Sequence, residues 1–295
     1  MKIKAISLLA FIGSVSTSFA TVYVYDGFSG YTTDVSVVGQ GPTSTGFSGD
    51  WTNRGGALAA TVNFNPRETG LSYTNYGPSS AGSLEAFRSS GSHTGGAKQV
   101  GRNLSYTADT EDFYISFLIA NNSTSAVSNT IVRLQGLGSA NADRDSLFQI
   151  NHSTNTLQFS LGGGVGLTGS ASLQAGANLV VVRAIYDFDS PTAGNPNAAF
   201  YDQVEVWINP TLSAGGNPTV DTLGAPLASG FGIMRSFNGS GNALPFNSLN
   251  FQHSLNSGSV VLDEFMIAAI PEPQTYAALF GLAALAMVLY RRRAR

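Results

Sequence analysis

The chain has 295 residues, of which 11% are charged, and a formal net charge of −3 at neutral pH. It has no cysteine, which excludes a disulfide framework, a thiolate metal site and a cysteine nucleophile. Ser, Thr, Asn and Gly are abundant, and the polar ones compete with helical backbone hydrogen bonds, so the composition favours short strands over helices.

Residues 1–20 have the layout of a secretory signal peptide. Two lysines and an apolar run open the segment, and small residues lead up to Ala20. Signal peptidases cut after such small residues. We therefore expect the mature protein to begin at Thr21; the alternative is a buried first strand or helix.

Residues 21–269 contain ten short runs rich in Val, Ile, Tyr and Phe, separated by clusters of Gly, Asn, Pro or Ser. The runs lie at residues 21–28, 58–64, 112–120, 130–135, 147–150, 156–161, 178–188, 203–209, 248–252 and 259–269. This pattern predicts one all-β domain, an antiparallel jelly-roll β-sandwich. We expect two antiparallel sheets in which the first run pairs close to the last.

Several of these segments resemble concanavalin A-like, LamG-type jelly rolls. The matching stretches are "DGFSGY" (26–31), "GFSGDW" (46–51), "FYISFLIA" (113–120), "NLVVVRAIYDF" (178–188), "DQVEVWINP" (202–210) and "VVLDEFMIA" (260–268). The resemblance implies that the fourth and fifth stretches are adjacent long strands of the concave sheet. It implies that the last stretch, with Asp263 and Glu264, is the closing strand. This fold carries lectins, glycosidases, lyases and adhesive modules alike, so the resemblance implies no single activity.

The carboxylates do not form a catalytic pattern. A retaining glycosidase needs two carboxylates about 5–5.5 Å apart, and residues on one face of a strand are two or four positions apart. Asp202 and Glu205 are three apart, which places them on opposite faces of a regular strand. Glu111 and Asp112 are adjacent in sequence. Asp187 and Asp189 are two positions apart, but they lie where the predicted strand ends and a loop begins. We therefore predict no catalytic residue.

Metal and phosphate sites have little support. His93, His152 and His253 are far apart and lack ligand spacing, so no metal site is predicted. "LGGGVG" (161–166) lacks the lysine and helix of a phosphate loop and indicates a glycine-rich turn. Calcium is the one cofactor to consider, because residues 143–145 and Asp187–Asp189 could supply oxygen ligands to it.

A candidate ligand-binding face lies on the run at 203–209. The alternating Val and Ile residues of this run share one face, which we expect to be buried, so Gln203, Glu205 and Trp207 share the opposite one. We expect Trp207 to be exposed to solvent. An exposed tryptophan beside a carboxylate and an amide suits a sugar ring; cover by a loop is the alternative.

The body is acidic once the two ends are set aside. Residues 21–270 hold nine Lys and Arg against 17 Asp and Glu, a net charge of −8. They show no stripe of basic residues, so we expect no nucleic-acid partner.

Residues 270–295 combine three features in a fixed order. A Pro271-Glu272-Pro273 triplet precedes the uncharged run 275–290, which as a helix would extend about 24 Å, a little short of the ~30 Å hydrocarbon core of a bilayer. The chain then ends in a basic cluster, which we expect to hold that end in the cytoplasm. The cluster consists of Arg291, Arg292, Arg293 and Arg295.

This arrangement resembles the PEP-CTERM sorting signal of Gram-negative bacteria. The resemblance implies an inner-membrane precursor that an exosortase-type protease cuts near the triplet, followed by transfer to the cell surface or extracellular space. The alternative is a permanent anchor. Together these features predict a non-enzymatic surface or matrix protein associated with exopolysaccharide. The alternatives are a lectin-like carbohydrate-binding module and, less favoured, a glycan-cleaving enzyme.

Overall fold

A computed structural model describes the body of the chain and a few residues of its C-terminal segment. The described residues are 21–41, 44–55, 62–88, 98–108, 112–121, 130–136, 146–153, 156–160, 169–186, 201–212, 223–234, 246–253 and 259–269, with 281, 284, 287, 290 and 291. The chain divides into two compact units. One is Val22–Ala269, and the other consists of Met1–Thr21 and Ile270–Arg295.

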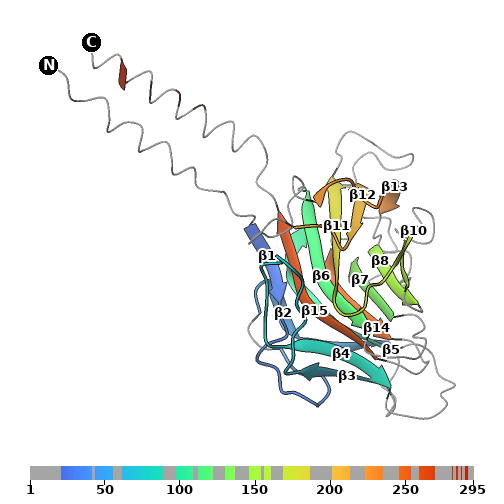
Figure 1. Ribbon diagram of the computed structural model, residues 1–295. Helices are drawn as coiled ribbons and strands as arrows, with labels where there is room; N and C mark the ends of the chain where they lie inside the picture. The colour runs from blue at the N-terminus through green and yellow to red at the C-terminus, as the bar shows by residue number, and fades with distance from the viewer. Residues whose placement is uncertain are drawn as a thin grey trace, which may run out of the picture. The chain divides into compact units, whose positions relative to one another are not determined.

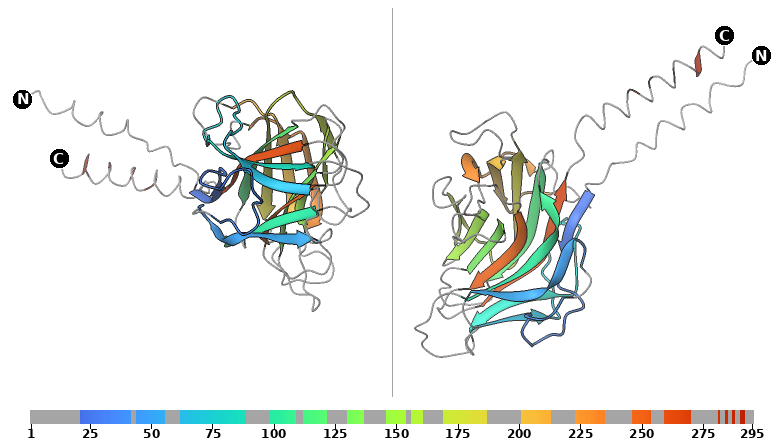
Figure 2. Two further views of the ribbon diagram at one scale, coloured as in Figure 1. Left: turned by 90° about the horizontal axis from the view of Figure 1, so that it is seen from below. Right: turned by 180° about the vertical axis from the view of Figure 1, so that it is seen from behind.

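The strands of the body form two antiparallel sheets (Figures 1 and 2). The eight-stranded sheet runs in the order β13 (Ala228–Met234), β12 (Tyr201–Ile208), β11 (Asn178–Tyr186), β6 (Phe113–Asn121), β15 (Ser259–Ala269), β4 (Ser83–Arg88) and β3 (Val62–Arg67), with β1 (Thr21–Asp26) also paired to β15. The seven-stranded sheet runs in the order β10 (Gly169–Ser172), β9 (Thr156–Ser160), β8 (Ser146–Ser153), β7 (Thr130–Gly136), β14 (Phe246–His253), β5 (Lys98–Ala108) and β2 (Phe47–Gly55). The predicted pair of antiparallel sheets is confirmed.

The last two strands of the body lie in the middle of the two sheets. β15 pairs with both β4 and β6, and β14 pairs with both β5 and β7. β1 joins β15, so the first strand pairs with the last, as the sequence predicts. The two central strands therefore pair with strands that are distant in sequence, and neither sheet is complete until its own last strand, β15 or β14, is in place.

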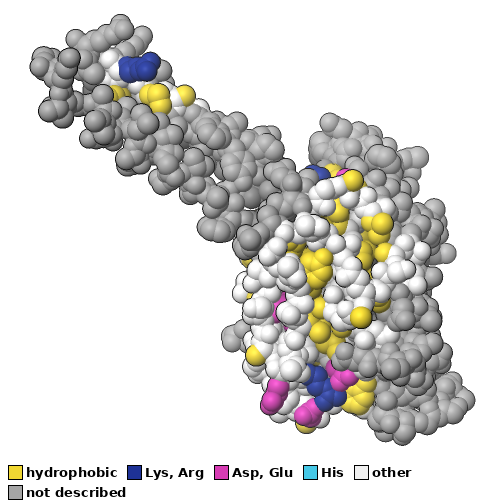
Figure 3. All heavy atoms as spheres, in the orientation of Figure 1, with side chains coloured by type: hydrophobic (Ala, Val, Ile, Leu, Met, Phe, Trp, Pro, Cys, Tyr) yellow, Lys and Arg dark blue, Asp and Glu magenta, His cyan; other side chains and the backbone are white. Residues whose placement is uncertain are grey.

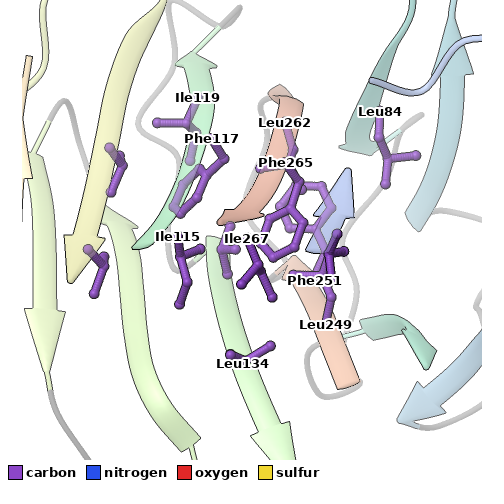
Figure 4. Packing of buried hydrophobic residues seen from close by; sticks show 14 of the residues in the cluster. Leu84, Ile115, Phe117, Ile119, Leu134, Leu249, Phe251, Leu262, Phe265 and Ile267 are labelled. Atoms are coloured by element: carbon purple, nitrogen blue, oxygen red, sulfur yellow. The ribbon is translucent and has the colours of Figure 1, made fainter. Parts of the chain in front are cut away.

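Alternating apolar residues of the two sheets meet in one core. Figure 4 shows this core, with side chains from β4, β6 and β15 of one sheet facing side chains from β7 and β14 of the other. Phe64 meets Phe251 edge to face, with ring centroids 5.6 Å apart, and Phe47 meets Phe265 at 6.2 Å. Such aromatic pairs contribute beyond the apolar area that they bury.

A bulge interrupts β15 between Asp263 and Met266. Leu262 points into the core before the bulge and Phe265 does so after it, so the inward-facing parity changes from even to odd. Glu264 takes a φ of 51° within the bulge, a conformation uncommon outside glycine. The bulge thereby places two consecutive acidic residues, Asp263 and Glu264, at one point of the sheet.

Most of the predicted sorting segment lies outside the described residues, as do the whole predicted signal peptide, the Pro271-Glu272-Pro273 triplet and three of the four terminal arginines. Positions 281, 284, 287, 290 and Arg291 are helical and exposed. Within the described residues, the structure contains no helix with the length and hydropathy needed to cross a bilayer.

Candidate functional site

The predicted ligand residue Trp207 is buried. Its neighbours on β12 behave as expected, because Val204 and Val206 belong to the core and Trp207 lies on the opposite face. The prediction that Trp207 is exposed is nevertheless wrong, since its side chain is only 4% exposed. Its indole N–H donates to the carbonyl of Gly224 at 3.1 Å, and Leu227 N–H donates to Val206. Residues 223–227 therefore cover the tryptophan, as the loop alternative proposed.

Glu205 is engaged within the same sheet. Arg183 on β11 lies opposite Glu205 in register and donates to its carboxylate at 3.3 Å. The same guanidinium donates to Asp112 at 2.9 Å and lies over the ring of Tyr114. The Gln203 side chain lies outside what the structure describes. The three predicted residues thus do not form an open sugar platform through Trp207.

A second segment packs over the outer face of this sheet. The Tyr76 hydroxyl lies 2.8 Å from that of Ser116 on β6. Tyr73 and Asn75 donate to the carbonyls of Pro210 and Leu212.

In Figure 3 the described charged side chains gather mainly toward the end where β3 and β4 lie, and Arg67 of β3 pairs there with Glu85 of β4.

The seven-stranded sheet presents a different outer face. On β5, β14 and β7 the residues Val100, Phe251 and Val132 align in register and belong to the core, so their sequence neighbours point outward. Several of these outward positions, with Asn103 further along β5, carry an amide or a guanidinium. With an arginine of β2 they form a cluster that we name the arginine–amide band. The band consists of Arg54, Asn103, Asn250, Gln252 and Arg133.

Side-chain contacts link the band from strand to strand. Arg54 of β2 donates through Nη2 to Asn103 Oδ1 of β5. Arg133 of β7 donates through Nη2 to Gln252 Oε1 of β14 at 2.8 Å. Arg133 and Asn250 are each only 2% exposed, whereas Arg54, Asn103 and Gln252 are half-buried. The band thus has two deep members and three that solvent reaches.

A glycine lets the band continue across β5. A Cβ at Gly101 would lie 2.2 Å from Asn250 Oδ1 and 2.8 Å from Arg54 Cγ. The asparagine and the arginine stem therefore fill the space that a side chain would occupy. This close packing brings the β2 and β14 members of the band together above the strand between them.

Sequence reasoning missed the arginine–amide band. The alternation in "TIVRLQ" and "SLNFQ" identifies the two strands and the side of each that faces the core. It does not show that β14 lies between β7 and β5, which brings Arg133 beside Gln252. Nor does "GDWTNRG" show that it forms a strand beside β5.

The second polar cluster is buried and contains the two acids of the β15 bulge. Glu264 accepts from the Tyr25 hydroxyl at 2.5 Å and from Ser80 N–H. Asp263 accepts from Leu71 N–H at 2.6 Å and from Glu264 N–H at 2.7 Å. Burial, and then the charge of Glu264, raise the pKa of Asp263 to about 8, while the two N–H donors oppose the rise. Burial and Glu264 also raise the pKa of Tyr25.

A buried ion pair stands at the end of β1. Asp26 accepts from Arg102 Nη1 of β5 at 3.1 Å, from the Tyr31 hydroxyl at 2.6 Å and from Phe28 N–H. Trp51 donates its indole N–H to that same Tyr31 hydroxyl. Arg102 and Asp26 are 3% and 1% exposed. The pair joins the two sheets and has the features of a structural contact.

The described residues give little support to a metal site or a catalytic site. Among these residues no three His, Cys, Asp or Glu lie together in a way that could hold a metal ion. Residues 143–145 and 187–189, which the sequence offered for calcium, lie outside the described part of the chain, as do His93 and Glu111. His253 is buried, with Nδ1 2.8 Å from the Thr130 hydroxyl.

Comparison with known proteins gives only distant likenesses. No family model matches the sequence, and no curated protein is significantly similar to it. Among solved structures, the globular domain of T. cruzi calreticulin has a TM-score of 0.44 at 10% identity, covering 92% of this chain and 99% of its own. The cellulose-induced protein Cip1 has a TM-score of 0.43 at 12% identity, with 75% and 91% covered. The endo-β-1,4-glucuronan lyase of the fungus Trichoderma reesei has a TM-score of 0.37 at 11% identity, with 75% and 94% covered. At these values the likenesses bear on neither the activity nor the ligand of this chain.

Proposed function

We propose that this chain is an exported bacterial surface protein whose concanavalin A-like body binds polysaccharide without cleaving it. One observation carries the proposal, namely the arginine–amide band on the outer face of the seven-stranded sheet. Side-chain amides both donate and accept hydrogen bonds, and guanidinium groups donate several in a fixed plane. A ligand rich in hydroxyl groups matches this mixture.

The geometry of the sheet supports an extended ligand. The band crosses four neighbouring strands, β2, β5, β14 and β7, which are spaced by about 4.8 Å. A linear chain lying across the strands would meet polar groups of each strand in turn. Deep packing of Arg133 and Asn250 holds the half-buried members in place, which lowers the entropy lost on binding.

A non-enzymatic role is supported by how four carboxylates on the described strands are used. Glu205 is paired with Arg183, and Glu85 is paired with Arg67. Asp263 and Glu264 are fully buried and accept backbone and tyrosine hydrogen bonds. A glycosidase needs one carboxyl that can protonate the leaving group and a second that faces the substrate.

Export and sorting rest on the two ends of the sequence. We propose that the signal peptide is removed after Ala20. The tail would then be cut near Pro271-Glu272-Pro273 by an exosortase-type protease, which would leave the body at the cell surface. The ordered triplet, uncharged run and arginines support this route. A purely structural matrix component remains the second candidate, because sorting alone would deliver it to the same place.

A panel of purified neutral and acidic polysaccharides tests the function of the body. The mature protein isolated from its host is run through native gels that contain each polymer. Retardation by at least one polymer, without any shortening of that polymer, is the expected result. Migration unchanged by every polymer would leave the structural role, and a falling polymer length would indicate an enzyme.

A further inference from the structure

The two sheets differ in charge. Within the strand bounds given above, the seven-stranded sheet holds four basic residues and one acidic residue, namely Arg54, Lys98, Arg102 and Arg133 against Asp50. The eight-stranded sheet holds three basic and six acidic residues, namely Arg67, Arg88 and Arg183 against Asp26, Glu85, Asp202, Glu205, Asp263 and Glu264. The seven-stranded sheet thus carries more basic than acidic residues, although residues 21–270 as a whole have a net charge of −8.

Arg54 is the half-buried guanidinium of the band, whereas Arg133 is only 2% exposed. The Nη2 of Arg54 donates to Asn103, but its Nε is buried and has no hydrogen-bond partner among the described residues. A buried donor without a partner costs free energy, which an arriving acceptor would offset. Burial also lowers the pKa of Arg54, and a neighbouring anion would favour its charged form.

Arg133 has a different place in the band. It is almost fully buried and donates to Gln252 Oε1. That bond fixes the orientation of the amide and directs its NH₂ group away from Arg133. Arg133 is therefore a positioning residue, and Gln252 is the group that a ligand would meet.

We propose that the arginine–amide band selects polysaccharides that carry carboxylate groups, with Arg54 as the residue that contacts the carboxylate. The inference rests on the proposed function and names the ligand class of the same face. A carboxylate is planar and takes two parallel N–H donors from a guanidinium. The surrounding amides suit the hydroxyl groups of the same sugar.

Charge complementarity favours this ligand over a nucleic acid. A polyphosphate chain carries charge at every step and is held by many Lys and Arg contacts. The band offers two guanidinium groups among three amides, on a body of net negative charge. That balance fits a polymer in which hydroxyl groups outnumber carboxylates.

The test compares one polymer in two chemical forms. Polygalacturonate and its carboxyl-reduced derivative share a backbone and differ in charge. The full chain in mild detergent is titrated with each polymer at low and at physiological salt. We expect the acidic form to bind at least about tenfold more tightly, with a preference that weakens as salt rises.

Variants then assign the preference to Arg54. Arg54→Gln is expected to lose the preference for the acidic form while it retains binding of the reduced form. Arg67→Gln, on the other sheet, is the matched control and should behave as the unaltered chain. If Arg54→Gln fails to fold, Arg54→Lys keeps the charge but not the planar donor pair, and an intermediate preference is expected.

The outcomes separate the two proposals. Equal binding of both polymers by the unaltered chain overturns the carboxylate preference and leaves polysaccharide binding intact. Binding of neither polymer overturns the preference and counts against the proposed function. Single-stranded DNA bound as tightly as polygalacturonate would show a general affinity for polyanions and would also overturn the inference.

Discussion

The hydroxyl of Tyr25 on the first strand donates a 2.5 Å hydrogen bond to the carboxylate of Glu264 on the last strand, 239 positions later. Glu264 also accepts from Ser80 N–H in the segment before β4. One carboxylate in a β-bulge therefore ties three distant parts of the body together.

Tyr25→Phe tests this contact directly. Loss of a hydrogen bond to a charged group is expected to lower the free energy of unfolding by about 1.5–3 kcal/mol. Urea denaturation followed by circular dichroism measures the change. Tyr73→Phe is the matched control, because Tyr73 donates to the neutral carbonyl of Pro210 and should cost only about 0.5–1.5 kcal/mol. Equal losses in the two variants would contradict a special role for Glu264.

The raised pKa of Asp263 predicts a pH-dependent stability. The folded carboxyl keeps its proton up to about pH 8, whereas in the unfolded chain it ionises near pH 4, at its ordinary pKa of about 3.9. The folded state thus binds more protons between these values. Its stability from this group is full below pH 4 and falls as pH rises toward 8, by at most about 1.4 kcal/mol per pH unit.

Asp263→Asn should flatten that dependence, whatever it does to absolute stability. Denaturation midpoints from pH 4 to pH 8 measure the slope. Glu68→Gln removes a carboxylate from an exposed position and serves as the control. A slope that persists in Asp263→Asn would assign the titration to another group.

The burial of both tryptophans predicts a quenching experiment. Trp51 is 0% exposed and Trp207 is 4% exposed, and the chain has two tryptophans in all. Their fluorescence should be blue-shifted and resistant to acrylamide until the protein unfolds. Trp51→Phe isolates the signal of Trp207. Efficient quenching of that variant under native conditions would mean that residues 223–227 do not cover the ring.

Gly101→Ala should damage the arginine–amide band. The added methyl group would lie 2.2 Å from Asn250 Oδ1 and 3.0 Å from the backbone oxygen of Leu249. Overpacking of this kind is expected to cost about 1–3 kcal/mol of stability. Polysaccharide binding should also weaken, because Arg54 and Asn250 are displaced. Gel retardation and thermal unfolding of the same sample measure both effects, and binding that stays unchanged would count against the band.

The tail predicts a defined processing event. Each arginine costs about 2.5–3.5 kcal/mol at the bilayer centre on insertion scales, so the four should halt translocation and hold the triplet outside the membrane. Mass spectrometry of surface-located protein should recover no peptide that joins the body to residues 276–290. Replacing the four arginines by serine should let uncut precursor escape. Correct processing of that variant would make the charge incidental.

The sequence by itself determined the class of fold and the face of many strands. All ten predicted runs contain or become strands, because Val, Ile, Tyr and Phe at alternate positions suit a pleated, half-buried surface. The strands β2, β4, β5, β10 and β13 were not predicted. Each is polar, short or rich in glycine, and each is held by pairing with a neighbour rather than by its own propensity.

Only the tertiary structure decided which side chains meet. The alternation on β12 correctly places Val204 and Trp207 on opposite faces, but exposure depends on residues 223–227, which fold back over the indole. Arg133 and Gln252 meet because β14 lies beside β7, and Tyr25 reaches Glu264 because β1 joins β15. Local patterning sets the direction of a side chain, whereas the partners in these two contacts are 119 and 239 positions apart, and no local pattern encodes such pairings.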